Sequence, residues 1–199
     1  PGVTRRVQAL RDMGYRIAVD DRSVKIGLPE STLGLLLRQI TGFSGLVHDN
    51  MYRFEGWRFL SLGRSLERAG MLAGMLAWFA DDAAPEGAFD FAVEVGDSVL
   101  THRRLYAVAS NRATVVDLLG CDADNPRSIH YQLAELREHV AVLPGAREQG
   151  QMSQLSRAIM KLHADVAVKT PESLNTDALL AIRGELGVVS DLLTKAYLR

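Results

Sequence analysis

The sequence predicts an all-α protein, a bundle of about seven to eight helices that run mostly antiparallel. Apolar residues recur at steps of three and four along most of the chain, which is the period of an amphipathic helix. The prolines fall between these periodic segments, where a missing N–H does no harm. Hydrophobic residues make up 47% of the chain, enough to build a core and too many for a disordered segment.

The first 30 residues carry the weakest helical pattern. Apolar spacing suits a helix over residues 4–19, but Gly14 weakens it, and residues 15–27 also fit a β-hairpin. We therefore divide the chain into residues 1–30, an N-terminal segment of undecided secondary structure, and residues 31–199, the helical bundle.

A helix is expected to begin near Glu30, directly after Leu28-Pro29. Its apolar stripe is expected to face other helices. The members of that stripe are Leu33, Leu36, Ile40, Phe43, Val47 and Met51. The chain is then expected to bend near residues 53–56 or to run on into the next helix.

The longest helix is expected over residues 55–80, at the centre of the bundle. It is apolar on more than one side: Trp57, Leu60, Met71, Met75 and Trp78 form one sector, and Phe59, Leu62 and Leu66 lie opposite. Three glycines line up between these sectors, at Gly63, Gly70 and Gly74. Since glycine inside a helix costs about 1 kcal/mol relative to alanine, the line predicts that a neighbouring backbone approaches closely there.

Further helices are expected from Pro85 to about Ser110 and over residues 113–119. Asp124 and Asn125 are candidate caps of the next helix, with Pro126 at its first position and its end near Leu143. Two last helices carry heptad-like stripes. Their members are Met152, Leu155, Ile159, Leu162 and Val166, and then Leu179, Ile182, Leu186, Val189, Leu193 and Tyr197.

Composition excludes some classes of protein. The net charge of −1 argues against a dedicated nucleic-acid binder, which carries a basic excess. No apolar run approaches the roughly 18–20 residues that cross a bilayer, so no membrane partner is expected. Cys121 is the single cysteine and cannot form an internal disulfide. With no visible signal peptide, a cytoplasmic location is expected, and Pro1 in place of Met suggests a fragment.

The sequence lacks the usual catalytic signatures. It contains no Gly-rich phosphate loop, HExxH, CxxC or GxSxG, and no cofactor or metal is expected. Glu135 and His139, four residues apart, could share a metal, but a solvated helix pair explains them better.

Arg64 and Glu67 on the long helix are the candidate catalytic residues, with three interpretations left open. They form a surface ion pair, a buried pair that fixes helix register, or a polar site inside the bundle with Glu67 as acid, base or ligand. The buried structural pair is the preferred interpretation, because the glycine line is expected to bring another helix to this position.

His102, Arg103 and Tyr106 form a second candidate site. Arginine suits planar anions, so these residues could bind phosphate or carboxylate. A basic strip on a helix is more often simply solvated.

Three blocks, FSGLVHDNM (43–51), GWRFLSLGRSLERA (56–69) and CDADNPRSIHYQL (121–133), together with the ending SDLLTKAYLR, resemble the bacterial Alpha-E domain family. The resemblance covers residues 31 to the end and looks like the C-terminal half of the family domain, because each repeated block occurs once. Its motifs fall on Gly63, Arg64, Glu67 and Arg68, and then on Asp124, Asn125, Pro126, Arg127 and Ser128.

The resemblance implies an all-α domain that works with circularly permuted ATP-grasp proteins. Arg68 and Arg127, which lie in its motifs, are further candidate binding residues. The first functional hypothesis is therefore a helical accessory domain of an ATP-grasp-type ligase, in peptide or amide-bond formation or protein tagging. The second is an enzyme with a polar Arg/Glu site inside the bundle, acting on an amine or carboxylate. The third is a purely structural dimerisation bundle, and whether the chain forms a homo-oligomer stays open. The missing nucleotide signature favours a chain that is no enzyme on its own.

Overall fold

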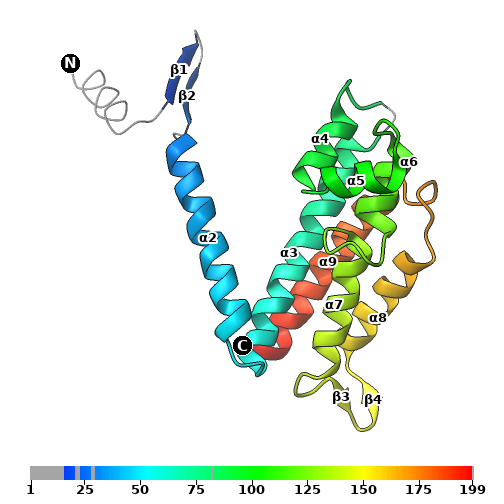
Figure 1. Ribbon diagram of the computed structural model, residues 1–199. Helices are drawn as coiled ribbons and strands as arrows, with labels where there is room; N and C mark the ends of the chain where they lie inside the picture. The colour runs from blue at the N-terminus through cyan, green and yellow to red at the C-terminus, as the bar shows by residue number, and fades with distance from the viewer. Residues whose placement is uncertain (1–15, 21–22, 28–29, 82, 199) are drawn as a thin grey trace. The chain divides into compact units, whose positions relative to one another are not determined.

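The computed structural model describes residues 16–20, 23–27, 30–81 and 83–198 (Figure 1). These residues fall into two compact units, divided between Tyr52 and Arg53. The sequence suggests a bundle from residue 31 onward, whereas the contacts group the first long helix with the residues before it. The short non-helical segment Met51–Phe54 contains the boundary between the two units.

The first unit contains a hairpin and one helix. Strands β1 (Arg16–Asp20) and β2 (Ser23–Gly27) pair antiparallel, and α2 spans Glu30–Asn50. The hairpin alternative is thus confirmed, and residues 4–15 of the alternative helix lie outside the described residues. The predicted start of α2 is confirmed. Its large apolar side chains remain between 42% and 62% exposed at Leu33, Leu36, Ile40 and Phe43, so no described residue of this unit buries the stripe.

The second unit is an antiparallel helical bundle, which confirms the predicted fold class. Its elements are α3 (Glu55–Phe79), α4 (Ala88–Val95), α5 (Val99–Tyr106), α6 (Arg112–Val116), a π-helical turn (Asp117–Cys121), α7 (Ile129–Ala141), β3 (Arg147–Glu148), β4 (Gln151–Met152), α8 (Gln154–Ala167) and α9 (Thr176–Tyr197). Helix α3 packs against α7 and α9, and α8 packs against the same two helices. Helices α4, α5 and α6 gather at the C-terminal end of α3 (Figure 1). No helix in the described part of the chain has the length and apolar character needed to cross a membrane.

The core-facing side of α3 is built from leucines and alanines. Leu62, Ala69, Leu72, Ala73 and Leu76 are at most 1% exposed. Their spacing of three and four residues makes one stripe, and the two alanines let α7 and α9 approach closely. The final stripes are also confirmed, because the predicted leucines, isoleucines and valines of α8 and α9 are buried in the same core, except Leu193, which is partly buried against it.

The glycine line of α3 does not bring a backbone close, so that prediction is wrong. A Cβ at Gly63 or Gly70 would meet no described atom within 4 Å, and at Gly74 the nearest is Nη1 of the Arg183 side chain, at 3.3 Å. The tightest approach is at Gly120 in the π-helical turn, where a Cβ would come within 2.6 Å of Leu174. Alanines, not glycines, provide the close packing of α3.

Helix caps explain where four of the helices begin. The side chains of Asn111, Ser128, Ser153 and Asn175 each accept a hydrogen bond from the third residue of the helix that follows. The prediction of Asp124 or Asn125 as the cap of α7 is therefore wrong, since Ser128 caps it. Asn125 instead closes a turn, with its side-chain oxygen accepting from the Arg127 N–H.

The helix predicted from Pro85 to Ser110 is in fact two helices. Helix α4 ends at Val95, and α5 begins at Val99. Between them Asp97 adopts a left-handed conformation with φ of 49°, which turns the chain. The break brings Asp97 to Arg127, with a distance of 2.6 Å between Oδ2 and Nη2.

Arg112, at the start of α6, fixes the connection between α8 and α9. Its guanidinium donates to the carbonyl of Pro171 at 2.8 Å and to that of Leu174 at 2.9 Å. One planar side chain thereby satisfies two carbonyls of a loop about 60 residues further along the chain. Leu174 itself is fully buried below this loop.

Candidate functional site

Glu67 and Arg68 sit next to each other on α3 but in different environments. Successive residues of an α-helix point about 100° apart. Glu67 and Arg64 are exposed, whereas Arg68 is half-buried. The preferred interpretation of Arg64 and Glu67 as a buried pair is wrong, because the core stripe of α3 lies on its leucine and alanine face. Among the described residues neither makes an ion pair.

Arg68 lies in a positively charged neighbourhood. Its partial burial, the guanidinium of Arg127 and that of Arg64, in that order, lower the pKa of Arg68. Arg127 has its own partner, Asp97, while no described residue pairs with Arg68. An anionic group beside Arg68 would relieve this repulsion. Arg68 and Arg127, which the sequence suggested as binding residues, are thus brought together.

An exposed stripe continues from Glu67 along α3. We call it the outer stripe, and it consists of Arg64, Glu67, Met71 and Trp78, at steps of three, four and seven residues. Met71 is 52% exposed and Trp78 is 74% exposed. Of the apolar sector that contains them, only Met71 and Trp78 are exposed; Trp57 and Leu60 are half-buried, and Met75 is buried.

His102 and Arg103 line a pocket of about 540 Å³ between α4, α5 and the segment after α5. We call it the His102 pocket; it is lined by Asp90, Val93, Glu94, Val99, His102, Arg103, Val108, Ala109 and Ser110. Tyr106 does not line it. Its hydroxyl donates to Oδ2 of Asp117 at 2.7 Å, and burial followed by this carboxylate raises the pKa of Tyr106. The Tyr106 ring packs on the His102 ring, with centroids 5.0 Å apart, but of the three residues of the second candidate site only His102 and Arg103 line the pocket.

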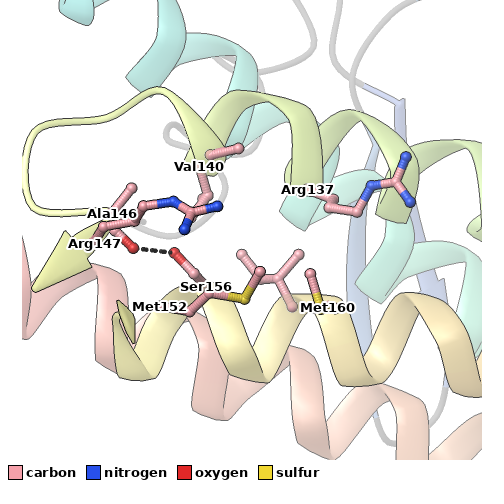
Figure 2. Close-up of a pocket in the computed structure, with 9 residues that line it drawn as sticks. Arg137, Val140, Ala146, Arg147, Met152, Ser156 and Met160 are labelled. Atoms are coloured by element: carbon pink, nitrogen blue, oxygen red, sulfur yellow. Dashed lines mark hydrogen bonds between the residues drawn. The ribbon is translucent and has the colours of Figure 1, made fainter. Parts of the chain in front are cut away.

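A smaller pocket of about 80 Å³ lies between α7, the β3–β4 hairpin and α8 (Figure 2). Met152, Ile159 and Met160 make its apolar part, and Arg137 and Arg147 lie on its polar side. The Ser156 hydroxyl donates to the Ala146 carbonyl at 3.0 Å and holds the hairpin against α8. Ordinary ligand sites measure about 300–1,000 Å³, so this pocket is too small for one.

Glu135 and His139 form a pair on α7, with 3.7 Å between Oε2 and Nε2. His139 is 7% exposed and meets the edge of the Trp57 ring, with ring centroids 5.0 Å apart. Among the described residues no group of three or more His, Cys, Asp and Glu side chains is placed to hold a metal ion. The pair is a packing feature of the α3–α7 contact.

Cys121 is a weak nucleophile in the folded chain. Its thiol is partly buried at the end of the π-helical turn. Burial, followed by the negative charges of Asp117 and Glu172, raises the pKa of Cys121 to about 11. Because the thiolate is the reactive form, this cysteine is a poor candidate for covalent chemistry.

The bundle is expected to lose stability as the pH falls from 7.5 to 5. Burial lowers the pKa of His139; the charge of Glu135 opposes this effect, and that of Arg58 reinforces it. The pKa of His163 is also lowered, first by burial and then by the charges of Arg137 and His130. Since the unfolded chain binds protons more readily, this stability is complete above about pH 6.5 and is lost below it. His139 alone contributes a slope of at most about 1.4 kcal/mol per pH unit.

Urea denaturation followed by circular dichroism across this pH range measures the slope. His139→Gln and His163→Gln should each flatten it, and the double variant should flatten it most. At pH 8, where both imidazoles are neutral in either state, the comparison reports only the lost packing. A slope unchanged in the double variant would contradict the assignment.

Sequence reasoning missed Asp90 and Glu94. Both line the His102 pocket from α4, one turn apart. Their spacing was visible, but only the turn at Asp97 brings α4 back against α5, and that turn was not predicted. The sequence also shows the residues of the outer stripe, but not that their side chains are exposed on the surface of the second unit.

Comparison with known proteins places the chain in a family. The model of the Alpha-E family, described as a predicted alpha-helical domain with a conserved ER motif, matches residues 7–198. The dipeptide Glu-Arg occurs once in the sequence, at Glu67-Arg68. The match begins well before residue 31, so it takes in most of the segment that the sequence resemblance left out.

Three uncharacterized proteins, two from strains of Mycobacterium tuberculosis and one from Mycobacterium bovis, are each 26% identical over 188 residues. The aligned region covers 92% of this chain and 20% of each relative, so the chain spans about a fifth of the length of the curated relatives it matches. No solved structure matches the chain. With the family model matching nearly all of it, the chain belongs to the Alpha-E family of helical domains.

Proposed function

We propose that the chain is a helical accessory domain that docks onto an ATP-grasp-type ligase active in peptide or amide-bond formation or protein tagging. The partner class follows from the sequence resemblance. The observation that carries docking is the outer stripe, in which an exposed tryptophan and methionine lie in line with the Glu67 of the ER dipeptide. The chain aligns with only 20% of the length of a much longer relative, which supports a role as one module among others.

The composition of the outer stripe is that of an interface centre. Tryptophan, methionine and arginine are enriched at protein interfaces, and buried tryptophans often dominate the binding energy. Trp78 and Met71 would supply apolar area, and Arg64 and Glu67 would supply charged partners at its end. Docking would thus cover the two large apolar side chains that α3 exposes.

Arg68 gives the proposed contact a preferred charge. It lies between two other guanidiniums and has no partner among the described residues. A carboxylate of the partner would form a charge-assisted hydrogen bond there. Glu67 and Arg68 would then act differently, Glu67 in the stripe and Arg68 at its side.

The exposure of Glu67 removes the support for the enzyme alternative. An acid or base inside the bundle needs a site closed to bulk water, where its pKa can be tuned. None of the four pockets described in the second unit is lined by Glu67. The dimerisation alternative remains as an outcome of the test below.

The test is co-purification of the chain with the ATP-grasp protein of the same organism, followed by ATP-hydrolysis assays with and without the chain. We expect a complex and an altered hydrolysis rate. Trp78→Ser should weaken binding by about 30-fold or more, as for loss of a central tryptophan. Glu67→Gln should weaken it by less, because the charge lies at the end of the stripe.

Val168→Ser is the matched control, because Val168 is 79% exposed at the end of α8, a helix that packs on α7 and α9. It should leave binding unchanged. No complex together with an unchanged hydrolysis rate would overturn the proposal. So would Trp78→Ser converting a dimer of the chain into a monomer with no effect on ligase binding, which would indicate the dimerisation bundle.

A further inference from the structure

The His102 pocket is lined by a buried histidine, and among the described residues only one of its two ring nitrogens has a hydrogen-bond partner. His102 is 3% exposed, and its Nε2 lies 2.9 Å from Oγ1 of Thr114. That hydroxyl donates to the Asn111 carbonyl and accepts from the Asn111 N–H. With that hydrogen donated to the Asn111 carbonyl, Nε2 of His102 is the donor to the hydroxyl, and Nδ1 is the ring nitrogen that can accept.

Nδ1 of His102 has no hydrogen-bond partner among the described residues. Every fully enclosed side-chain nitrogen and oxygen in that part of the chain does have one. Nδ1 is therefore not completely enclosed, and the pocket is the opening that His102 lines. The protein thus presents a ring nitrogen without a partner among the described residues at the wall of a cavity.

The other polar groups of the pocket define the ligand that fits. Asp90 and Glu94 bring two carboxylates from α4, so three acceptors lie around one space. A primary ammonium group, with three N–H donors, satisfies such a set. A metal ion does not, since the described residues form no group of three ligands at metal distances.

Arg103 and three valines of the pocket indicate two further groups of the ligand, a carboxylate and an apolar side chain. Arg103 is the one arginine or lysine that lines the pocket, and a guanidinium binds a carboxylate with two parallel hydrogen bonds. Val93, Val99 and Val108 provide the apolar wall. The volume of about 540 Å³ lies within the range of small-molecule sites.

We propose that the His102 pocket binds a free α-amino acid with an apolar side chain. Its ammonium lies between Nδ1 of His102 and the carboxylates of Asp90 and Glu94, its carboxylate meets Arg103, and its side chain packs on the valines. This site belongs to the α4–α5 end of the bundle and uses no residue of the outer stripe. It therefore stands apart from docking to a ligase.

The test is calorimetric titration of the full chain with L-leucine at pH 7.5. We expect saturable binding of one molecule per chain. Removing either charge of the ligand should weaken it, so 3-methylbutylamine and 4-methylpentanoate should each bind at least about tenfold more weakly, the loss of one charged hydrogen bond. Glycine should also bind more weakly, because it lacks the apolar side chain.

Exposed residues of the pocket give variants that leave the fold intact. Glu94→Gln and Arg103→Gln should each weaken leucine binding at least about tenfold. Glu86→Gln and Arg104→Gln are the matched controls, since both residues are exposed and do not line the pocket. They should bind leucine like the parent chain.

Three results would overturn the proposal: no saturable binding of leucine, equal binding of 4-methylpentanoate, or unchanged binding by both Glu94→Gln and Arg103→Gln. Equal loss in the Arg104→Gln control would also overturn it, because the effect would then be one of surface charge. Thermal unfolding of each variant checks that the bundle is intact.

Discussion

Replacing Leu76 with alanine is expected to lower the free energy of unfolding of the bundle by about 3–5 kcal/mol. Leu76 is fully buried on the core stripe of α3, and its Cδ1 lies 3.9 Å from the position of a Cβ at Gly120. The π-helical turn and Leu174 leave little freedom to close the cavity, so both the transfer term and the cavity term are lost. Urea denaturation followed by circular dichroism measures the change.

Met71→Ala on the same helix is the control. Met71 is 52% exposed, so its truncation should cost less than about 1 kcal/mol. Similar losses for Leu76→Ala and Met71→Ala would mean that α3 faces the core with a different side. The pair of variants thus tests the orientation of the central helix as well as the size of the effect.

Asn125→Asp is expected to cost about 3 kcal/mol, although the two side chains have nearly the same shape. Asn125 is 7% exposed, and its amide donates to the Leu118 carbonyl at 2.8 Å. A carboxylate cannot donate, so the substitution places a buried negative charge against a carbonyl oxygen. Chemical denaturation at pH 7.5 measures the loss.

The pH dependence identifies the cause of that loss. A carboxyl that is buried beside a carbonyl is favoured in its protonated form, which restores a donor. The gap in stability between Asn125→Asp and the parent chain should therefore shrink as the pH falls toward about 4. Asp124→Asn is the matched control, because Asp124 is exposed and its side chain makes no hydrogen bond among the described residues. A gap that widens at low pH would contradict the explanation.

The buried side of a helix could be predicted from the sequence where the helix has one apolar stripe. For the central helix, only the first and last residues could be predicted, and not the buried side. On α8 and α9 the heptad spacing leaves a single candidate for the buried side, and the structure buries that side. On α3 two sectors are apolar. The sequence did not decide between the two sectors, and the packing uses the leucine and alanine stripe, because small side chains permit close helix contact.

The ends of helices were missed where a tertiary contact decides them. Asn125-Pro126 is a plausible helix start, yet the Asn125 amide is needed by the Leu118 carbonyl, and Ser128 caps α7 in its place. The break between α4 and α5 depends on Asp97 in a left-handed conformation, with its carboxylate held by Arg127. Asp97 and Arg127 lie 30 residues apart, beyond the reach of local patterns.

The candidate sites could be predicted residue by residue but not as groups. The sequence singled out His102, Arg103 and Tyr106 because they are close together on one helix. In the structure Tyr106 turns to Asp117, while His102 and Arg103 share a pocket with carboxylates of α4. His102 and Tyr106 share a face of α5 at a spacing of four, but their partners on other helices decide which site each side chain joins.

The pairing of α3 with α9 has a consequence for how the bundle assembles. The α7–α8 and α8–α9 contacts join helices that are neighbours in the chain, and the α3–α7 contact spans α4 to α6, whereas the α3–α9 contact joins the first helix of the unit to the last. Its closure carries the largest loop entropy, so its formation is the slow event of assembly. On the ribosome the part of the α3 surface that α9 covers stays exposed until α9 has emerged, even after α7 has packed on α3. A chaperone that recognises apolar helix faces would find its binding site there during that interval.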